Sequence, residues 1–128
     1  MLNLDYKCME YGQDIAKQGD ENNLRKSLGV LQEDGVYAMF LWIEDKEKNN
    51  KEKNIRNILT KLLNEQEIKK FLLGDSNRFE QEFDKFCENL QEVAKDIDKL
   101  LFMKKILERA LTYALYHAKI GEQNVGKN

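Results

Sequence analysis

Apolar residues recur every three or four positions along most of the chain, which is the spacing of one face of an α-helix. The spacing is most regular between residues 79 and 100. It predicts helices near residues 3–18, 22–33, 35–47, 51–64, 66–73, 76–94 and 97–120, the last two forming either two helices or one long one. We therefore expect an all-α protein: a single compact bundle of about six to seven helices over residues 1–121, followed by a flexible tail at residues 122–128.

The densest apolar segment of the chain is residues 36–43, which has acidic residues on both sides. It is far shorter than the 20 or so residues that a membrane-spanning helix needs, and as a strand it would have no partner. A helix that is apolar on nearly every side is normally enclosed by other helices. We therefore predict a central helix here, with Phe40, Leu41 and Trp42 buried in the middle of the bundle. No signal peptide is recognisable, so we expect a cytoplasmic protein without a membrane partner.

Glycines and polar residues mark where the predicted helices end and begin. Four glycines fall where a periodic segment ends, as expected after helix C-termini: Gly19, Gly35, Gly74 and Gly121. Gly12 and Gly29 fall inside predicted helices, where glycine indicates close packing against a neighbouring helix. Asn77 and Glu80 have the spacing of a capping box and predict the start of the helix over residues 76–94.

Residues that carry chemistry are scarce. The single histidine, His117, falls on the apolar side of the last predicted helix, where we expect a hydrogen-bonded residue of the core or of an interface. Cys8 and Cys87 lack the spacing of a metal or redox motif and are expected to be small apolar core residues. No glycine-rich phosphate loop is present. We therefore expect a protein that is not an enzyme and needs no cofactor or metal; a helical hydrolase using His117 is a weaker alternative.

Charge is distributed unevenly, although the net charge at pH 7 is only −2. Residues 48–70 hold seven basic and three acidic residues, and residues 99–119 hold five basic residues against the single acidic residue Glu108. On the last predicted helix, four of these cations share one face: Lys104, Lys105, Arg109 and Lys119. Such a face is either simply solvated or placed against phosphates or a partner protein.

Two segments carry a resemblance to a known family. The first, RKSLGVLQEDGVYAMFLWI, has basic residues upstream of a tight turn that opens an apolar helix: Arg25, Lys26 and the turn Asp34-Gly35-Val36. The second, RALTYALYHAKIGE, has a small-apolar pair followed by an aromatic and a basic residue: Ala110-Leu111, Tyr116 and Lys119. In this order the features resemble the small helical subunit of type III-B CRISPR–Cas (Cmr) effector complexes; the small subunit of type III-A complexes is a close rival.

The resemblance implies a non-catalytic subunit of an RNA-guided complex. Such subunits stack head to tail, beside the guide-bound backbone of the complex, and contact target RNA without cutting it. The implied partners are other subunits of the complex, copies of the chain itself, and the backbone of guide or target RNA. The candidate RNA-binding residues are Arg25, Lys26, Lys104, Lys105, Arg109 and Lys119. The alternative is a helical protein-interaction or adaptor module with no role in binding nucleic acid.

Overall fold

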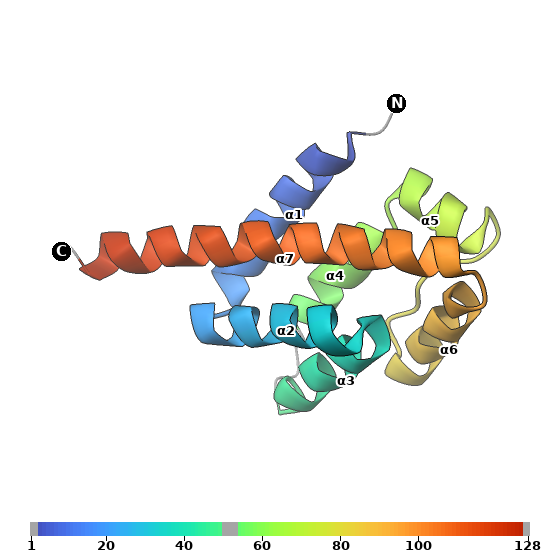
Figure 1. The fold of residues 1–128 in the computed structure, drawn as a ribbon, viewed down its shortest axis with the longest axis horizontal. Coiled ribbons are helices and arrows are strands. Elements are labelled where there is room, and N and C mark those ends of the chain that lie inside the picture. The colour runs from blue at the N-terminus through green and yellow to red at the C-terminus, as the bar shows by residue number, and fades with distance from the viewer. Residues whose placement is uncertain (1–2, 50–53, 127–128) are drawn as a thin grey trace.

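The computed structural model describes residues 3–49 and 54–126, and every regular element within them is a helix (Figure 1). In chain order the helices are α1 (Leu4–Gln18), α2 (Glu21–Asp34), α3 (Val36–Lys46), α4 (Asn54–Leu63), α5 (Gln66–Leu73), α6 (Phe83–Ala94) and α7 (Ile97–Gly126). The predicted all-α class is confirmed, and α1, α2, α3 and α5 begin and end within one residue of their predicted bounds. The start of the predicted helix 51–64 lies outside the described residues. No described helix is long and apolar enough to span a bilayer.

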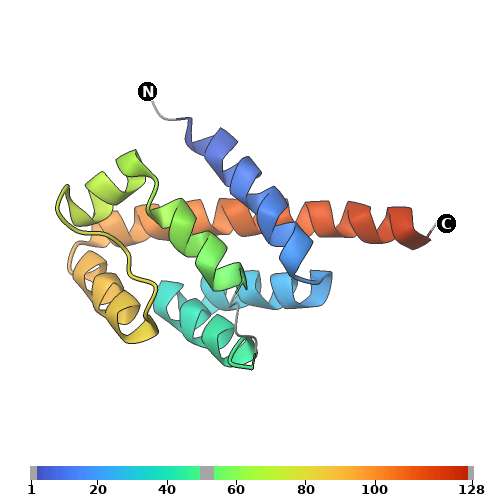
Figure 2. The ribbon, with the colours of Figure 1, turned by 180° about the vertical axis from the view of Figure 1, so that it is seen from behind.

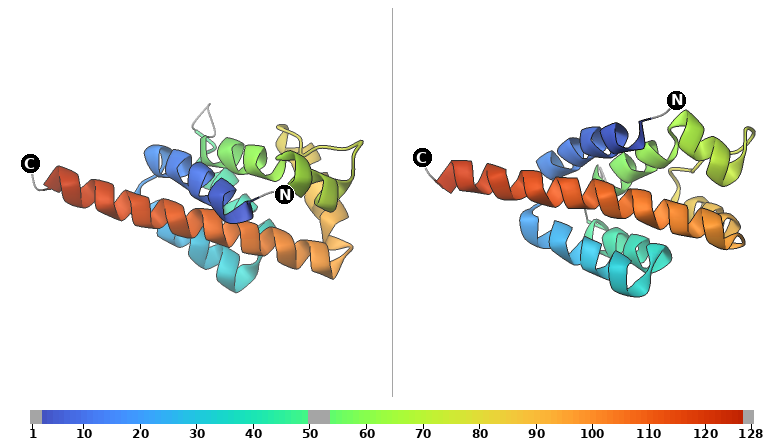
Figure 3. Two further views of the ribbon diagram at one scale, coloured as in Figure 1. Left: turned by 90° about the horizontal axis from the view of Figure 1, so that it is seen from above. Right: turned by 45° about the horizontal axis from the view of Figure 1, so that its top comes forward.

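Helix α7 organises the molecule. It is 30 residues long and crosses in front of α1 in Figure 1, whereas α1 and α4 lie in front of it in Figure 2. The helices α1 and α2 pack on either side of it (Figure 3), and α3, α5 and α6 also contact it. Its inner side is buried through the stripe Met103, Leu107, Ala110, Leu111 and Ala114. The core therefore lies between α7 and the shorter helices.

The helices α1 and α7 approach each other closely at Gly12 in α1. A Cβ atom placed there would lie 2.9 Å from the backbone oxygen of Ala110 and 2.9 Å from the Cβ of Tyr113, both in α7. The prediction that Gly12 marks close packing is therefore confirmed. For Gly29 the same prediction is wrong, because a Cβ on that residue would meet nothing within 4 Å.

Helix α3 is not the enclosed helix that its composition predicted. Phe40 is fully buried, as expected, but Leu41 is 47% exposed and Trp42 is only partly buried. The buried residues of α3 are Val36, Met39, Phe40 and Ile43, the spacing of one helix face. The opposite face is also apolar but is exposed to solvent. The prediction that Leu41 and Trp42 are buried in the middle of the bundle was therefore wrong. The helix that packs against α1, α2, α3, α5 and α6 is α7.

Two of the four helix-end glycines have the backbone that glycine favours. Gly35 lies between α2 and α3 with φ +100°, and Gly74 follows α5 with φ +91°. Gly19 also follows its helix, but with an ordinary extended backbone. Gly121 does not end a helix, since α7 continues to Gly126, past the predicted end at residue 120 and into the segment expected to be a tail. A single glycine costs a helix about 1 kcal/mol without stopping it.

The predicted helix over residues 76–94 begins only at Phe83, so the predicted capping box is wrong. Upstream of it the chain is held by side chains instead. The amide of Asn64 accepts a hydrogen bond from the backbone N–H of Phe79 (2.8 Å) and donates one to the backbone oxygen of Phe79 (2.9 Å). The ring of Phe79 is fully buried. These tertiary contacts satisfy the backbone groups that helix formation would otherwise use. A two-residue break at Lys95 and Asp96 separates α6 from α7.

Candidate functional site

The predicted basic face lies on the outer side of α7. Lys105 and Arg109 are exposed, and Lys104 and Lys119 are partly buried. Arg109 lies at the edge of this face that borders α1, where its Nη1 atom is 3.2 Å from Asp5 Oδ1. The side chains of Lys105 and Arg109 also line a common surface depression of about 510 Å³. The structure therefore brings these two predicted residues together.

Ion pairs reduce the positive charge of this face. Asp5 Oδ1 accepts hydrogen bonds from Arg109 (3.2 Å) and from the hydroxyl of Tyr113 (2.5 Å), and the second of these raises the pKa of Tyr113. Lys104 Nζ lies 3.9 Å from Glu108 Oε1. In contrast, Lys105 makes no ion pair or hydrogen bond with any residue that the structure describes. Its charge is therefore available for a partner.

Near its C-terminal end, α7 combines basic and apolar groups. The ammonium of Lys119 lies 5.7 Å from the centre of the Tyr116 ring, and within the described part of the chain it pairs with no carboxylate. Tyr116 and Ile120 are both more than half exposed. His117 is also exposed, so of the two predicted alternatives it is not a core residue. The buried stripe passes through Leu111, Ala114, Leu115 and Ala118, and position 117 lies outside it.

The two predicted cations of α2 are separate from those of α7. Arg25 Nη2 lies 2.7 Å from Glu21 Oε1, which is an i, i+4 pair along the same helix. Lys26 is exposed. The six candidate residues are therefore divided between two helices that pack against each other, α2 and α7.

The residue that the sequence analysis missed is Arg56 in α4, whose side chain is only 4% exposed. Its Nε lies 3.2 Å from Glu44 Oε2, and its Nη2 donates to the backbone oxygen of Gln81. Its guanidinium also lies over the rings of Phe83 and Phe86, 5.7 and 5.2 Å from their centres. Arg56 therefore ties α3, α4 and α6 together. The signal in the sequence was a charged residue on the apolar stripe of its own helix, three positions before Leu59.

Glu47 adds a second buried charge beside Arg56. Its two carboxylate oxygens accept hydrogen bonds from the backbone N–H groups of Ile55 (3.0 Å) and Arg56 (3.2 Å). A carboxylate in this position satisfies donors in the first turn of α4 and interacts favourably with the helix dipole. This network holds the fold together from the inside, and we assign it a structural role.

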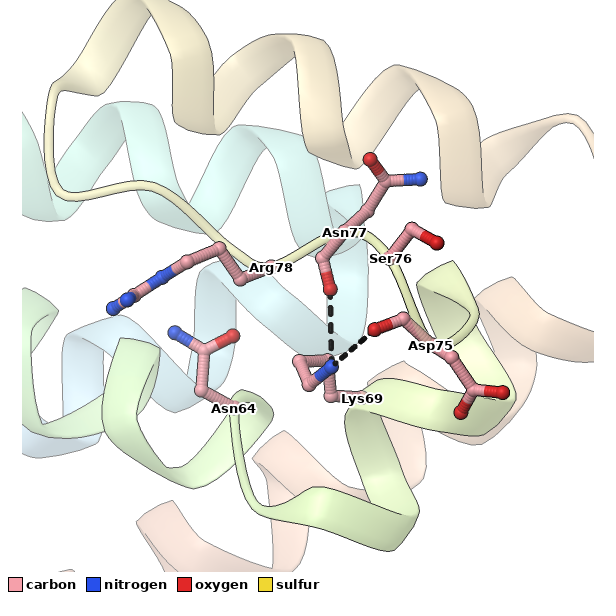
Figure 4. Close-up of a pocket in the computed structure, with 6 residues that line it drawn as sticks. All are labelled: Asn64, Lys69, Asp75, Ser76, Asn77 and Arg78. Carbon is pink, nitrogen blue, oxygen red and sulfur yellow. Dashed lines mark hydrogen bonds between the residues drawn. The ribbon is translucent and has the colours of Figure 1, made fainter.

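A third polar cluster lies in the loop between α5 and α6 (Figure 4). Six residues line a surface depression of about 430 Å³ there: Asn64, Lys69, Asp75, Ser76, Asn77 and Arg78. Lys69 Nζ donates hydrogen bonds to the backbone oxygens of Asp75 (3.4 Å) and Asn77 (3.2 Å). The loop is therefore fastened to α5 by a lysine side chain.

The cysteines differ in their surroundings. Cys8 is buried, as predicted, and its Sγ donates to the backbone oxygen of Ile106 at 3.7 Å. Burial raises the pKa of the Cys8 thiol to about 11, so it stays protonated near neutral pH. Cys87 is only partly buried. Within the described ranges, no three His, Cys, Asp or Glu side chains are grouped closely enough to hold a metal ion.

Comparisons of the chain with protein-family models, with curated proteins and with solved structures find no match. The functional argument therefore depends on the residues and geometry described above. The surface that combines predicted site residues with charge left available for a partner is the outer face of α7.

Proposed function

We propose that the chain is a non-catalytic small subunit of a Cmr-type, RNA-guided effector complex in the cytoplasm, and that the outer face of α7 contacts RNA. In this proposal guide–target base pairing carries the sequence specificity, and the subunit contributes contacts to phosphates. Its partners are the other subunits, further copies of the chain, and the guide or target RNA.

The family resemblance supports this proposal. The turn Asp34-Gly35-Val36 separates two helices, and its glycine has a positive φ, which glycine adopts more readily than other residues. In the second segment, Ala110 and Leu111 belong to the buried stripe of α7, while Tyr116 is 57% exposed. The residues that carry the resemblance thus divide into a buried set and an exposed set.

The observation that carries the proposal is the charge on the outer face of α7. Lys105 and Lys119 have no carboxylate partner among the described residues. They are 14 positions apart on one helix, which corresponds to about 21 Å at 1.5 Å per residue. This separation suits contacts with phosphates at two points along one strand. Arg109 lies on the same face, but part of its charge is offset by Asp5.

The proposal is tested by removing the two lysine charges in the assembled complex. Lys105→Gln/Lys119→Gln should weaken target-RNA binding for every target sequence. Each phosphate contact contributes about 0.7 to the slope of log affinity against log salt for a single strand, so the slope should flatten by about 1.4. The control is Lys85→Gln/Lys95→Gln, which removes the same charge from Lys85 on α6 and from Lys95 just after it; both lysines are exposed and pair with nearby glutamates. It should leave the slope unchanged.

Equal losses in both double variants would indicate a general charge effect and contradict the proposal. Unchanged RNA binding by a fully assembled Lys105→Gln/Lys119→Gln complex would also contradict it. If that variant instead fails to join the complex, the outer face of α7 binds protein.

A protein-interaction module is the second candidate, because the same helix exposes large apolar side chains. Ile97 is 62% exposed and Leu101 is 56% exposed. Apolar side chains at solvent favour contact with protein rather than with phosphates. Two results together would favour this second function. The Ile97→Ser/Leu101→Ser variant would no longer bind partner proteins, and binding of those partners by the unsubstituted chain would not depend on RNA.

A further inference from the structure

The loop between α5 and α6 is irregular but firmly held. At one end Gly74 ends α5 with φ +91°, and at the other the buried ring of Phe79 anchors the chain in the core. Two side chains from outside the loop hold its backbone. Lys69 binds the backbone oxygens of Asp75 and Asn77, and Asn64 binds both polar backbone groups of Phe79. An exposed loop fixed in this way presents its side chains in a defined arrangement, which lowers the entropy cost of binding a ligand.

Three side chains that line the depression keep unused hydrogen-bond donors. The Lys69 ammonium has three N–H groups, and two of them are used by the loop. The Asn64 amide nitrogen has two, of which one is donated to Phe79. The Arg78 guanidinium has five, and none is used by a residue within the described part of the chain. In Figure 4 the Arg78 side chain extends away from Lys69, and the Asn64 amide nitrogen is turned toward the side on which the Arg78 guanidinium lies.

The charges in the depression favour an anion. Lys69 and Arg78 are both cationic, and Asp75 is the only acidic residue that lines the depression. In Figure 4 the Asp75 carboxylate points away from Asn64 and Arg78. The backbone oxygens of Asp75 and Asn77 accept hydrogen bonds from the Lys69 ammonium, and its positive charge offsets their partial negative charge.

We propose that this depression binds a phosphate group through Arg78 and Asn64, with the Lys69 ammonium contributing a second positive charge from the other side of Asn64. The guanidinium presents paired N–H groups whose spacing matches two phosphate oxygens, and the ammonium adds a second positive charge. The phosphate belongs to the backbone of a bound RNA strand. That assignment rests on the proposed function, whereas binding of the phosphate group itself does not.

The experiment follows backbone amide shifts of the full chain during titration with inorganic phosphate and, separately, with a short single-stranded oligouridylate. Both ligands should shift the amides of residues 75–79. Arg78→Gln should weaken both interactions about tenfold, because a charge-assisted hydrogen bond to an anion is lost. Arg78→Lys keeps the charge but not the paired donors, so it should weaken them less. The matched control is Lys70→Gln, one residue from Lys69 on α5, exposed and outside the depression.

The absence of any shift in the loop with inorganic phosphate would overturn the proposal. Equal weakening by Arg78→Gln and Lys70→Gln would also overturn it, because the effect would then be one of overall charge. If phosphate shifts the loop but the oligouridylate does not, the assignment to RNA is wrong. Lys105→Gln/Lys119→Gln distinguishes this site from the outer face of α7, since it should leave the phosphate titration unchanged.

Discussion

Replacing Gly12 with alanine tests the packing of α1 against α7, the pair of helices with the most extensive contact. A Cβ at this position would lie 2.9 Å from the Ala110 oxygen, 2.9 Å from the Tyr113 Cβ and 3.2 Å from the Ala114 nitrogen. Two of these atoms belong to the backbone of α7 and cannot rotate away. The helices α1 and α7 must therefore move apart, and overpacking of this kind costs about 1–3 kcal/mol.

Alanine also favours the helix, by about 1 kcal/mol relative to glycine. The matched control is Gly29→Ala, in the interior of α2, where a new Cβ meets nothing within 4 Å. That variant should gain only the stabilisation of about 1 kcal/mol by which alanine favours a helix over glycine. The free energy of unfolding should then be about 1–3 kcal/mol lower for Gly12→Ala than for Gly29→Ala. For a domain of this size the difference corresponds to a melting temperature lower by about 4–12 °C.

The assay is urea and thermal unfolding followed by far-ultraviolet circular dichroism. A second measurement is the titration of Tyr113, whose pKa is raised by its hydrogen bond to Asp5 in α1. Moving α1 away from α7 should lower that pKa toward the ordinary value for tyrosine. If Gly12→Ala proves as stabilising as Gly29→Ala, the two helices do not approach each other as described, and the packing argument fails.

Three further predictions concern the core. Phe40→Ala should lower the free energy of unfolding by about 3–5 kcal/mol, whereas Leu41→Ala on the exposed side of α3 should change it by about 0.5 kcal/mol or less; similar losses would contradict the one-sided burial of α3. Arg56→Leu should lower it by about 3 kcal/mol in urea unfolding, because the buried contacts with Glu44 and a backbone oxygen are lost; a change below about 1 kcal/mol would refute this. The thiol of Cys8 has an ordinary pKa of 9.0 when unfolded and about 11 when folded, so stability should be unaffected by this group below pH 9 and fall as pH rises from 9 to 11; Cys8→Ala should remove that part of the pH dependence.

Helices with one apolar stripe could be predicted closely from the sequence. In α1 and α2 the apolar spacing, with a capping side chain at Asn3 or Asp20, determines both the element and its buried face. The spacing was uninformative for α3, where both faces are apolar. Which face packs inward there depends on the position of α2, α4 and α7, and that is a tertiary property.

The loop before α6 shows a second limit of prediction from the sequence. Its residues have the spacing of a helix start, but the amide of Asn64 takes the backbone groups of Phe79 from 15 positions earlier in the chain. No local pattern contains that information. The same holds for Arg109, which was predicted to be available for RNA but interacts with Asp5 at the opposite end of the chain. The depression beside Lys69 and Arg78 also could not be predicted, because the loop that forms it is held by the contacts of Asn64 with Phe79.

The pairing of α1 with α7 has a consequence for biosynthesis. The bond between Cys8 and Ile106 joins residues 98 positions apart, and that between Asp5 and Tyr113 joins residues 108 apart. At about 5–20 residues per second, a ribosome needs roughly 5–20 s to make the intervening chain. During that time the apolar face of α1 has no α7 to cover it. Nascent chains that stop before α7 should therefore be sensitive to protease and bind chaperones, whatever the stability of the finished protein.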